Sequence, residues 1–163
     1  MQFWWNFYYS LYWRKYKEMI RQHFSFLVDE YGFKEISIKN DVWGVRVEFC
    51  NLTTGIRAGY WVREGGFRVK LFRLVNGEIQ DNPLEINDDS VLNKYDLSML
   101  LSIRDPDFTK KAIQKHSEKL EDVDAIIEVA TDLRNKAHDI LSGDFTIFTE
   151  MEEMVKDNVR AYR

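Results

Sequence analysis

The feature that most constrains the fold is a run of alternating apolar and polar residues between Asp41 and Ile86. Alternation with a period of two is typical of β-strands that bury one face and expose the other. The residues predicted to share the buried face are Trp43, Val45, Val47, Phe49, Ile56, Ala58, Tyr60, Val62, Phe67, Val69 and Leu71. The run therefore predicts consecutive strands that present the same face to a core.

Short turns connect these strands. Asn51 to Gly55 and Glu64-Gly65-Gly66 interrupt the alternation, and Asn76-Gly77 is a strong hairpin signal because a type I′ turn needs positive φ at both central positions. Sequential strands joined by short turns are antiparallel neighbours. With a first strand from Phe33 to Asn40 and a last strand that ends near Ile86, we predict an antiparallel β-meander of four to five strands.

Helical periodicity flanks the meander. Apolar residues recur at spacings of three and four in the segments on both sides of it, and helix starts are predicted near Val91, at Asp105-Pro106, near Val123 and at Thr149 or Glu150. A sheet with one apolar face must bury it against another layer. We therefore predict a single α+β domain over residues 1–163. It comprises an aromatic-rich leader at 1–18, a helix at 19–32, the meander at 33–86 and a helical half at 91–163. The three to four helices of the helical half are expected to pack, with the N-terminal helix, on one face of the sheet.

The leader is unusually aromatic between Phe3 and Tyr16. Its apolar run is shorter than the roughly 20 residues that cross a membrane, and its basic residues follow the apolar run instead of preceding it as in a secretory signal. We expect the leader to pack on its own domain or to form a homodimer with a second copy. Contact with a membrane interface is the alternative. A natural start at Met19 would remove the leader altogether.

The charge is unevenly distributed although the net charge is only −4. Residues 42–74 carry six basic and two acidic side chains, whereas residues 75–163 carry 11 basic and 20 acidic ones. The two halves either attract each other or serve partners of opposite charge. The acidic residues Glu118, Glu121, Asp122, Asp124, Glu128 and Asp132 are interpreted as a solvated helix face, with an acceptor for a basic partner as the sharper alternative.

Residue patterns that would indicate catalysis or cofactor binding are missing from the sequence. His23, His116 and His138 have no second ligand at zinc-binding spacing, and no glycine-rich phosphate loop precedes a helix. Cys50 is the single cysteine, which excludes an intramolecular disulfide and suits a cytoplasmic location. It is interpreted as a packing residue and not as half of a thiol dyad. We therefore predict no catalytic residue, metal or cofactor, and favour a non-enzymatic protein.

The segment Arg134-Asn135-Lys136-Ala137-His138 resembles the Arg/His signature of the helical bacterial ribonucleases called HEPN domains. The resemblance implies a nuclease pair of Arg134 and His138, which share a face if both lie on one helix. The spacing is one residue shorter than the family's minimum, and a preceding sheet is foreign to that fold. Capping of the helix end by His138 is the alternative interpretation.

The strand face opposite the predicted core is rich in basic and aromatic residues. The candidate interface comprises Arg57, Trp61, Arg63, Arg68, Lys70 and Phe72. Trp and Arg concentrate binding energy at protein interfaces, and aromatic stacking with basic charge is also what single-stranded nucleic acid requires. The acidic total charge and the absence of an RNP-like motif argue against nucleic acid. Coverage by the leader or a second copy is the remaining alternative.

Two short segments resemble small bacterial α+β proteins of uncharacterised or toxin-immunity type. They are Phe26 to Phe33, at the end of the first helix, and Asp139 to Phe145, near the C-terminus. The resemblance covers about a tenth of the chain and implies a cytoplasmic protein-binding module that neutralises a cognate toxin. It assigns no functional residue. The alternative function is a nucleic-acid-binding or RNase-like protein that uses the basic strand face or the Arg134/His138 pair.

Overall fold

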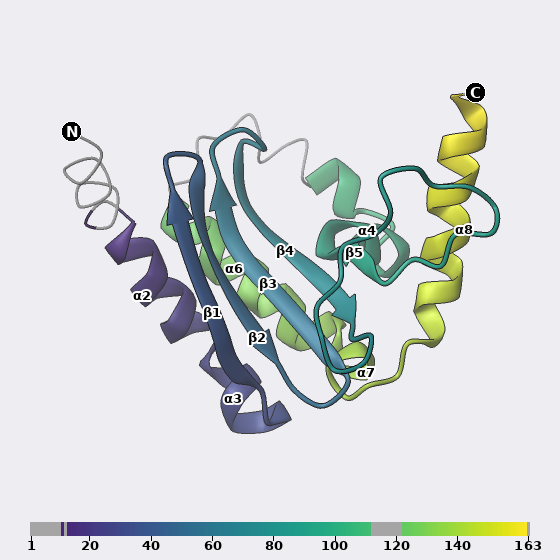
Figure 1. The fold of residues 1–163 in the computed structure, drawn as a ribbon. Helices are drawn as coiled ribbons and strands as arrows, with labels where there is room; N and C mark the ends of the chain where they lie inside the picture. The colour runs from purple at the N-terminus through teal and green to yellow at the C-terminus, as the bar shows by residue number, and fades with distance from the viewer. Residues whose placement is uncertain (1–10, 12, 112–121, 163) are drawn as a thin grey trace.

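The computed structural model describes residues 11, 13–111 and 122–162, and it contains one five-stranded antiparallel sheet (Figure 1). The strands are β1 (Lys34–Asp41), β2 (Gly44–Cys50), β3 (Thr54–Trp61), β4 (Gly66–Arg73) and β5 (Lys94–Asp96). Their spatial order equals their order in the sequence. The predicted antiparallel meander is confirmed.

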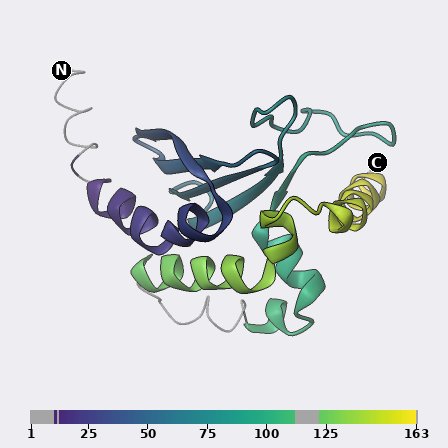
Figure 2. The same ribbon diagram turned by 90° about the horizontal axis from the view of Figure 1, so that it is seen from below.

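The described helices lie on one side of this sheet, except the last one, which lies beside it (Figure 2). They are α2 (Arg14–His23), α3 (Ser25–Tyr31), α4 (Leu97–Arg104), α6 (Asp122–Lys136), α7 (His138–Leu141) and α8 (Thr146–Ala161). Helices α2, α4 and α6 contact the sheet directly, whereas α8 lies beyond β5 at the side of the molecule. The predicted α+β class is confirmed, with the N-terminal and C-terminal helices on the same face.

The core lies between the sheet and these helices. Val47, Ile56 and Leu71 are completely buried and lie on the sheet face that the alternation predicted. Ile126 and Leu133 of α6 and Leu27 of α3 are also inaccessible to solvent and belong to the same cluster. The opposite face of the sheet, which we call the open face, has none of the described helices against it (Figure 2).

Ile36, Trp43 and Val62, apolar residues of the first three strands and the turns that follow them, are exposed. A β-bulge between Glu35 and Ser37 removes Ile36 from the ladder, so its side chain is 55% exposed, whereas Ile38 packs against the core. Trp43 and Val62 lie in the turns after β1 and β3 and are also exposed. The alternation predicted Trp43 and Val62 to be buried, because it contains no signal for the exact end of a strand.

The segment between β4 and β5 departs most from the prediction. Asn76 and Gly77 adopt φ of 53° and 78°, which confirms the turn, but no strand follows to Ile86 and no helix begins at Val91. Residues 74–93 instead form a long loop, the sheet is completed by β5 and the next helix begins at Leu97. The predicted division at residues 86 and 91 between meander and helical half is therefore wrong.

Hydrogen bonds made by side chains, and not the periodicity of the sequence, determine where the loop ends and β5 begins. The Asn82 amide accepts hydrogen bonds from the backbone N–H groups of Asn93 and Lys94, both at 2.9 Å, and donates one to the Lys94 carbonyl at 2.8 Å. Tyr95 is buried in the core with its hydroxyl donating to the Phe148 carbonyl at 3.3 Å. The loop is thus fixed against β5, which pairs with β4.

The predicted helices that fall within the described residues are present with different ends, whereas the prediction of a helix beginning at Asp105-Pro106 extends into residues 112–121, which lie outside the described part of the chain. The first is interrupted at Phe24, which separates α2 from α3, and Gly32 ends α3 in the predicted left-handed conformation with φ of 67°. The periodic stretch up to Leu141 is divided at Ala137, where φ is −120°. Helix α8 begins at Thr146, earlier than predicted, because the Asp144 carboxylate accepts the Thr146 N–H at 2.9 Å.

Part of the predicted leader belongs to the folded domain. Helix α2 begins at Arg14, not at residue 19, and Trp13 is only 2% exposed. Its indole N–H donates to the Asp41 carbonyl at 2.8 Å, and its ring packs 5.8 Å from that of Tyr60. The aromatic residues from Phe3 to Tyr9 lie outside the described residues. Within the described part of the chain, no helix has the length and apolar character needed to cross a bilayer.

Candidate functional site

The open face presents its side chains in rows that run across the strands, because directly paired residues project to the same side. The row nearest the loop contains Cys50, Gly55 and Phe72, the middle row contains Glu48, Arg57, Lys70 and Asp96, and the next row contains Lys39, Arg46, Gly59 and Arg68. Beyond them Trp61 lies between Gly44 and Gly66, close to the turns. The predicted interface residues on β3 and β4 thus do share one face.

Phe72 and Arg57 are held under the loop and are not a free surface. Phe72 is completely buried, and the Arg57 guanidinium carbon lies 4.9 Å from the centre of its ring. Arg57 donates to the Glu48 carboxylate at 2.6 Å and to Asp81 of the loop at 3.1 Å. The Arg57 side chain retains only 13% of its exposure. Both residues therefore join the loop to the sheet.

The loop packs so closely over β3 that residue 55 beneath it must be glycine. A Cβ atom on Gly55 would lie 2.8 Å from the Ile79 side chain and 3.1 Å from that of Leu74. These contacts place apolar loop side chains directly over β3, beside the buried ring of Phe72. Phe72, with Ile79 and Leu74 of the loop, consequently forms a smaller apolar cluster on the open face.

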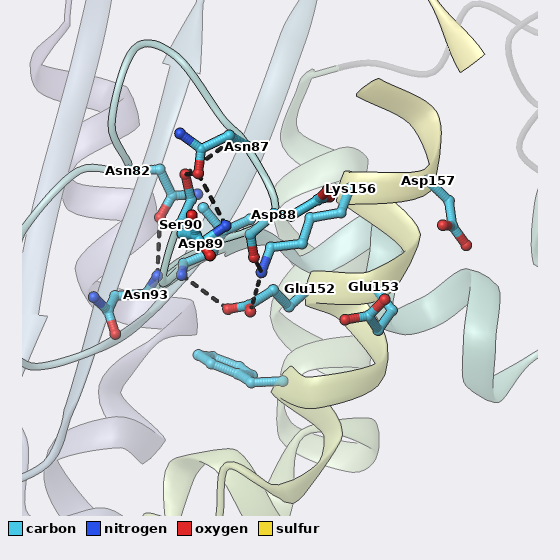
Figure 3. Close-up of polar contacts among 12 residues, drawn as sticks. Asn82, Asn87, Asp88, Asp89, Ser90, Asn93, Glu152, Glu153, Lys156 and Asp157 are labelled. Carbon is cyan, nitrogen blue, oxygen red and sulfur yellow. Dashed lines mark hydrogen bonds and ion pairs between the residues drawn. The ribbon is translucent and has the colours of Figure 1, made fainter. Parts of the chain in front are cut away.

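The other end of the loop is fixed to α8 by a buried charge network (Figure 3). Lys156 is only 6% exposed, and its ammonium donates to the Asp88 carbonyl and to the Glu152 carboxylate, both at 2.8 Å. Glu152 also accepts the Leu92 N–H at 2.9 Å. Burial alone would raise the pKa of Glu152, but the hydrogen bonds from Lys156 and Leu92 hold it below its ordinary value.

Lys70 is also engaged within the domain. Its ammonium lies 2.9 Å from the Asp96 carboxylate and 3.5 Å from that of Glu64, and its side chain is 17% exposed. Of the six predicted interface residues, Arg57, Lys70 and Phe72 are therefore covered or neutralised. Trp61, Arg63 and Arg68 remain toward the turns.

What we call the hairpin-end surface comprises the accessible part of the predicted interface, Trp61, Arg63 and Arg68, and two residues predicted to be buried, Trp43 and Val62. Trp43 and Val62 belong to neighbouring turns joined by a hydrogen bond of 2.9 Å from the Val62 N–H to the Trp43 carbonyl. The Arg63 guanidinium carbon lies 3.8 Å from the centre of the Trp43 ring, an arrangement typical of a cation–π contact. Trp43 is 49% and Val62 50% exposed.

Arg63 therefore does not extend the strand face as predicted, since β3 ends at Trp61. It lies in the β3–β4 turn and pairs with a tryptophan that sequence reasoning had assigned to the core. The signal that could have revealed Trp43 is its position two residues after Asp41, whose carboxylate accepts the Trp43 N–H at 2.7 Å and so forms an Asx turn. A residue inside such a turn is not part of the alternating strand.

Arg134 and His138 are not brought together. Arg134 donates to the Glu30 carboxylate and its guanidinium lies 5.7 Å from the centre of the Phe26 ring. His138 lies beyond the helix break, with Nδ1 3.1 Å from the Ser142 hydroxyl and its ring 5.8 Å from that of Tyr31. The two side chains have separate structural partners, because the helix on which they would share a face is interrupted at Ala137.

The remaining chemical candidates also have structural surroundings. Burial, with the nearby Glu48 carboxylate, raises the pKa of the Cys50 thiol to about 11, so it is protonated at neutral pH. No cluster of His, Cys, Asp or Glu capable of holding a metal ion occurs among the described residues. In the predicted acidic patch, Asp132 pairs with Lys136 at 3.5 Å, while Glu118, Glu121 and the histidine at 116 lie outside the described residues.

Comparisons with protein-family models, with curated proteins and with solved structures found no match.

Proposed function

We propose that this chain is a cytoplasmic, non-enzymatic protein-binding module and that the hairpin-end surface is its contact region. The observation that carries the proposal is the contact of Arg63 with Trp43, at 3.8 Å, on exposed turns beside Trp61. Trp and Arg are the residue types enriched at the energetic centres of protein interfaces. A pair already held in contact loses little conformational entropy on binding.

The rigidity of the support favours the same interpretation. The two turns are connected to each other by a backbone hydrogen bond and follow directly from the paired strands β1 to β4. Below them, Arg57 and Phe72 fix the sheet to the loop 74–93. Binding residues presented by loops on a rigid scaffold are a common arrangement for recognition.

The finer proposal is that the partner is a toxin and that this chain is its immunity protein. It is supported by the resemblance of Phe26 to Phe33 and of Asp139 to Phe145 to small bacterial proteins of that type. An immunity protein acts by stoichiometric binding, which needs no catalytic group of its own.

The test is complex formation with the protein encoded by the gene immediately upstream, followed by size-exclusion chromatography and titration calorimetry. We expect a one-to-one complex, and we expect Trp61→Ala and Arg63→Ala each to weaken it by about 2 kcal/mol, or roughly 30-fold in Kd. Arg134→Ala and Tyr162→Ala are matched controls on distant exposed positions and are expected to leave the affinity unchanged.

A complex that survives Trp61→Ala and Arg63→Ala unchanged would remove the hairpin-end surface from the proposal. Absence of any complex with the upstream protein would remove the immunity function. Binding of oligonucleotides at low ionic strength, with affinity that falls steeply with added salt, would favour the nucleic-acid alternative. The ion pairing of Arg57 and Lys70 with carboxylates leaves fewer free charges for phosphate groups than the sequence predicted.

A further inference from the structure

A row of basic residues next to Trp61 differs from the rest of the open face in its charge balance. In the middle row, Arg57 and Lys70 lie 2.6 Å and 2.9 Å from carboxylates. In the adjoining row, Arg46 lies 4.0 Å from the Glu48 carboxylate, and Arg68 lies 4.0 Å from that of Glu64. Both carboxylates make shorter contacts with other cations, Glu48 with Arg57 and Glu64 with Lys70. The row thus keeps positive charge that the domain does not neutralise.

Lys39 extends this row to the sheet edge. It pairs with Arg46 across β1 and β2, is exposed and forms no ion pair within the described part of the chain. We call Lys39, Arg46 and Arg68 the basic row. Its Arg68 also belongs to the hairpin-end surface, so the two surfaces are continuous.

Gly59 separates the two arginines of the row. Arg46 and Arg68 are its direct cross-strand partners, so their Cα atoms lie about 10 Å apart, twice the spacing of neighbouring strands. Gly59 is buried although it carries no side chain. Long arginine side chains on either side can therefore approach the same point above β3.

Glycine is required at this position. A Cβ atom on residue 59 would lie 2.4 Å from the Val45 carbonyl oxygen and 3.0 Å from the Arg46 Cβ atom. The close approach of β2 and β3 therefore excludes a side chain from between the two guanidinium groups.

The hydrogen bonding of Arg46 is also incomplete. Its Nε is buried and has no hydrogen-bond acceptor in the described structure, and the side chain keeps 32% of its exposure. Buried N–H groups are nearly always hydrogen-bonded in folded proteins, but the carboxylate nearest to this one, that of Glu48, lies 4.0 Å away and is bound by Arg57. A carboxylate matches a guanidinium in shape as well as in charge.

We propose that the protein partner contributes an acidic side chain that Arg46 and Arg68 bind together above Gly59, with an apolar neighbour of that side chain against Trp61. Trp61 lies two residues from Gly59 on the same face, and its direct cross-strand neighbours are Gly44 and Gly66. The indole thus stands without a side chain on either adjacent strand. This inference rests on the proposed function and specifies the chemistry of its partner.

A protein carboxylate fits this surface better than a nucleic-acid backbone. The row is short, and Glu48, Glu64 and Asp96 lie on or next to the same face. A single carboxylate meets only the two arginines, whereas a chain of phosphates extending along the face would also meet these acidic groups. Like charges in one interface cost binding energy.

The test is a selection of random peptides displayed on phage against the immobilised full chain. We expect the selected peptides to contain Asp or Glu next to an aromatic or aliphatic residue. The double variant Arg46→Gln/Arg68→Gln is expected to bind them about tenfold or more weakly, the range for a hydrogen-bonded charged group. Arg134→Gln, an exposed arginine on the helical side, serves as the control and is expected to bind them unchanged.

A matched change in the peptide keeps the test independent of how the variants fold. Replacing the peptide's Asp by Asn, or its Glu by Gln, is expected to weaken binding to the original chain but not to the double variant. If the selected peptides bind through Trp61 and lack an acidic preference, the inference is overturned and the proposed function stands.

If no selected peptide depends on Trp61, both are overturned. An oligothymidylate probe separates the remaining alternative. If it binds and the double variant abolishes its binding, the basic row is a nucleic-acid site and the inference is wrong.

Discussion

Lys156→Met is the substitution that most directly tests how the loop 74–93 is held over the open face. Lys156 is 6% exposed and makes hydrogen bonds of 2.8 Å to the Asp88 carbonyl and to the Glu152 carboxylate. A hydrogen bond to a charged group contributes about 1.5–3 kcal/mol, and leaving a buried charge without its partner costs about 3–5 kcal/mol. Because the Glu152 side chain is still 22% exposed, water compensates for part of this loss, and we expect a destabilisation of about 2–3 kcal/mol.

The assay is urea unfolding of the single and double variants in a thermodynamic cycle. Glu152→Gln keeps an acceptor for the Leu92 N–H, so its expected cost is about 1 kcal/mol. The coupling free energy between residues 152 and 156 is expected to be about 1–2 kcal/mol. Arg160→Met, whose partner Asp88 is exposed, is the control and is expected to leave the unfolding midpoint unchanged.

The pH dependence of the coupling follows from the carboxylate. The pKa of Glu152 is lowered in the folded protein, so its ionised form stabilises the fold above the ordinary value of 4.5. The contribution is lost as the pH falls through the lowered pKa, where the folded carboxylate becomes protonated. A Lys156→Met variant as stable as the original chain, or a coupling that persists at a pH where Glu152 is protonated, would refute the argument.

Three further predictions concern the sheet itself. Phe72→Ala is expected to lower the free energy of unfolding by about 3–5 kcal/mol, because its ring is completely buried beneath the loop, whereas Leu52→Ala, at a position 94% exposed, serves as a neutral control in the same urea assay. Gly59→Ala is expected to lower the free energy of unfolding, measured by thermal denaturation, by at least about 2 kcal/mol, since its Cβ atom would lie 2.4 Å from the Val45 carbonyl oxygen. An unchanged stability would show that β2 and β3 lie farther apart at this position. Cys50, with a thiol pKa of about 11, is expected to react with iodoacetamide at about pH 8 some two-hundredfold more slowly than an unhindered cysteine, measured by mass spectrometry; equal rates in buffer and in urea would contradict this.

Local patterns in the sequence were sufficient for the order and direction of the strands. The side-chain alternation through Val45, Val47 and Phe49 and the glycine turns predicted the meander, because each signal acts over neighbouring residues. The bulge at Ile36 and the helix break at Ala137 could not be predicted in this way. At the helix break, the Lys136 and Ile140 carbonyls accept hydrogen bonds from Arg104 and Thr54, which are distant in the sequence.

The candidate site was predicted only in part for the same reason. Arg57 and Phe72 were correctly assigned to one face, but their burial depends on Asp81 and Ile79 of a loop that has no periodic pattern. The contribution of Trp43 was missed because it continues the apolar alternation although it lies in a turn. Tertiary contacts thus decide which part of a basic, aromatic strand face remains accessible.

The most direct test of a binding role for the hairpin-end surface is amide hydrogen exchange of the complex with its protein partner. We expect added protection in residues 42–46 and 59–68, which contain both turns and the basic-row arginines, and none in residues 146–161 of α8. Protection confined to α6 or α8, with the turns exchanging as fast as in the free chain, would contradict it.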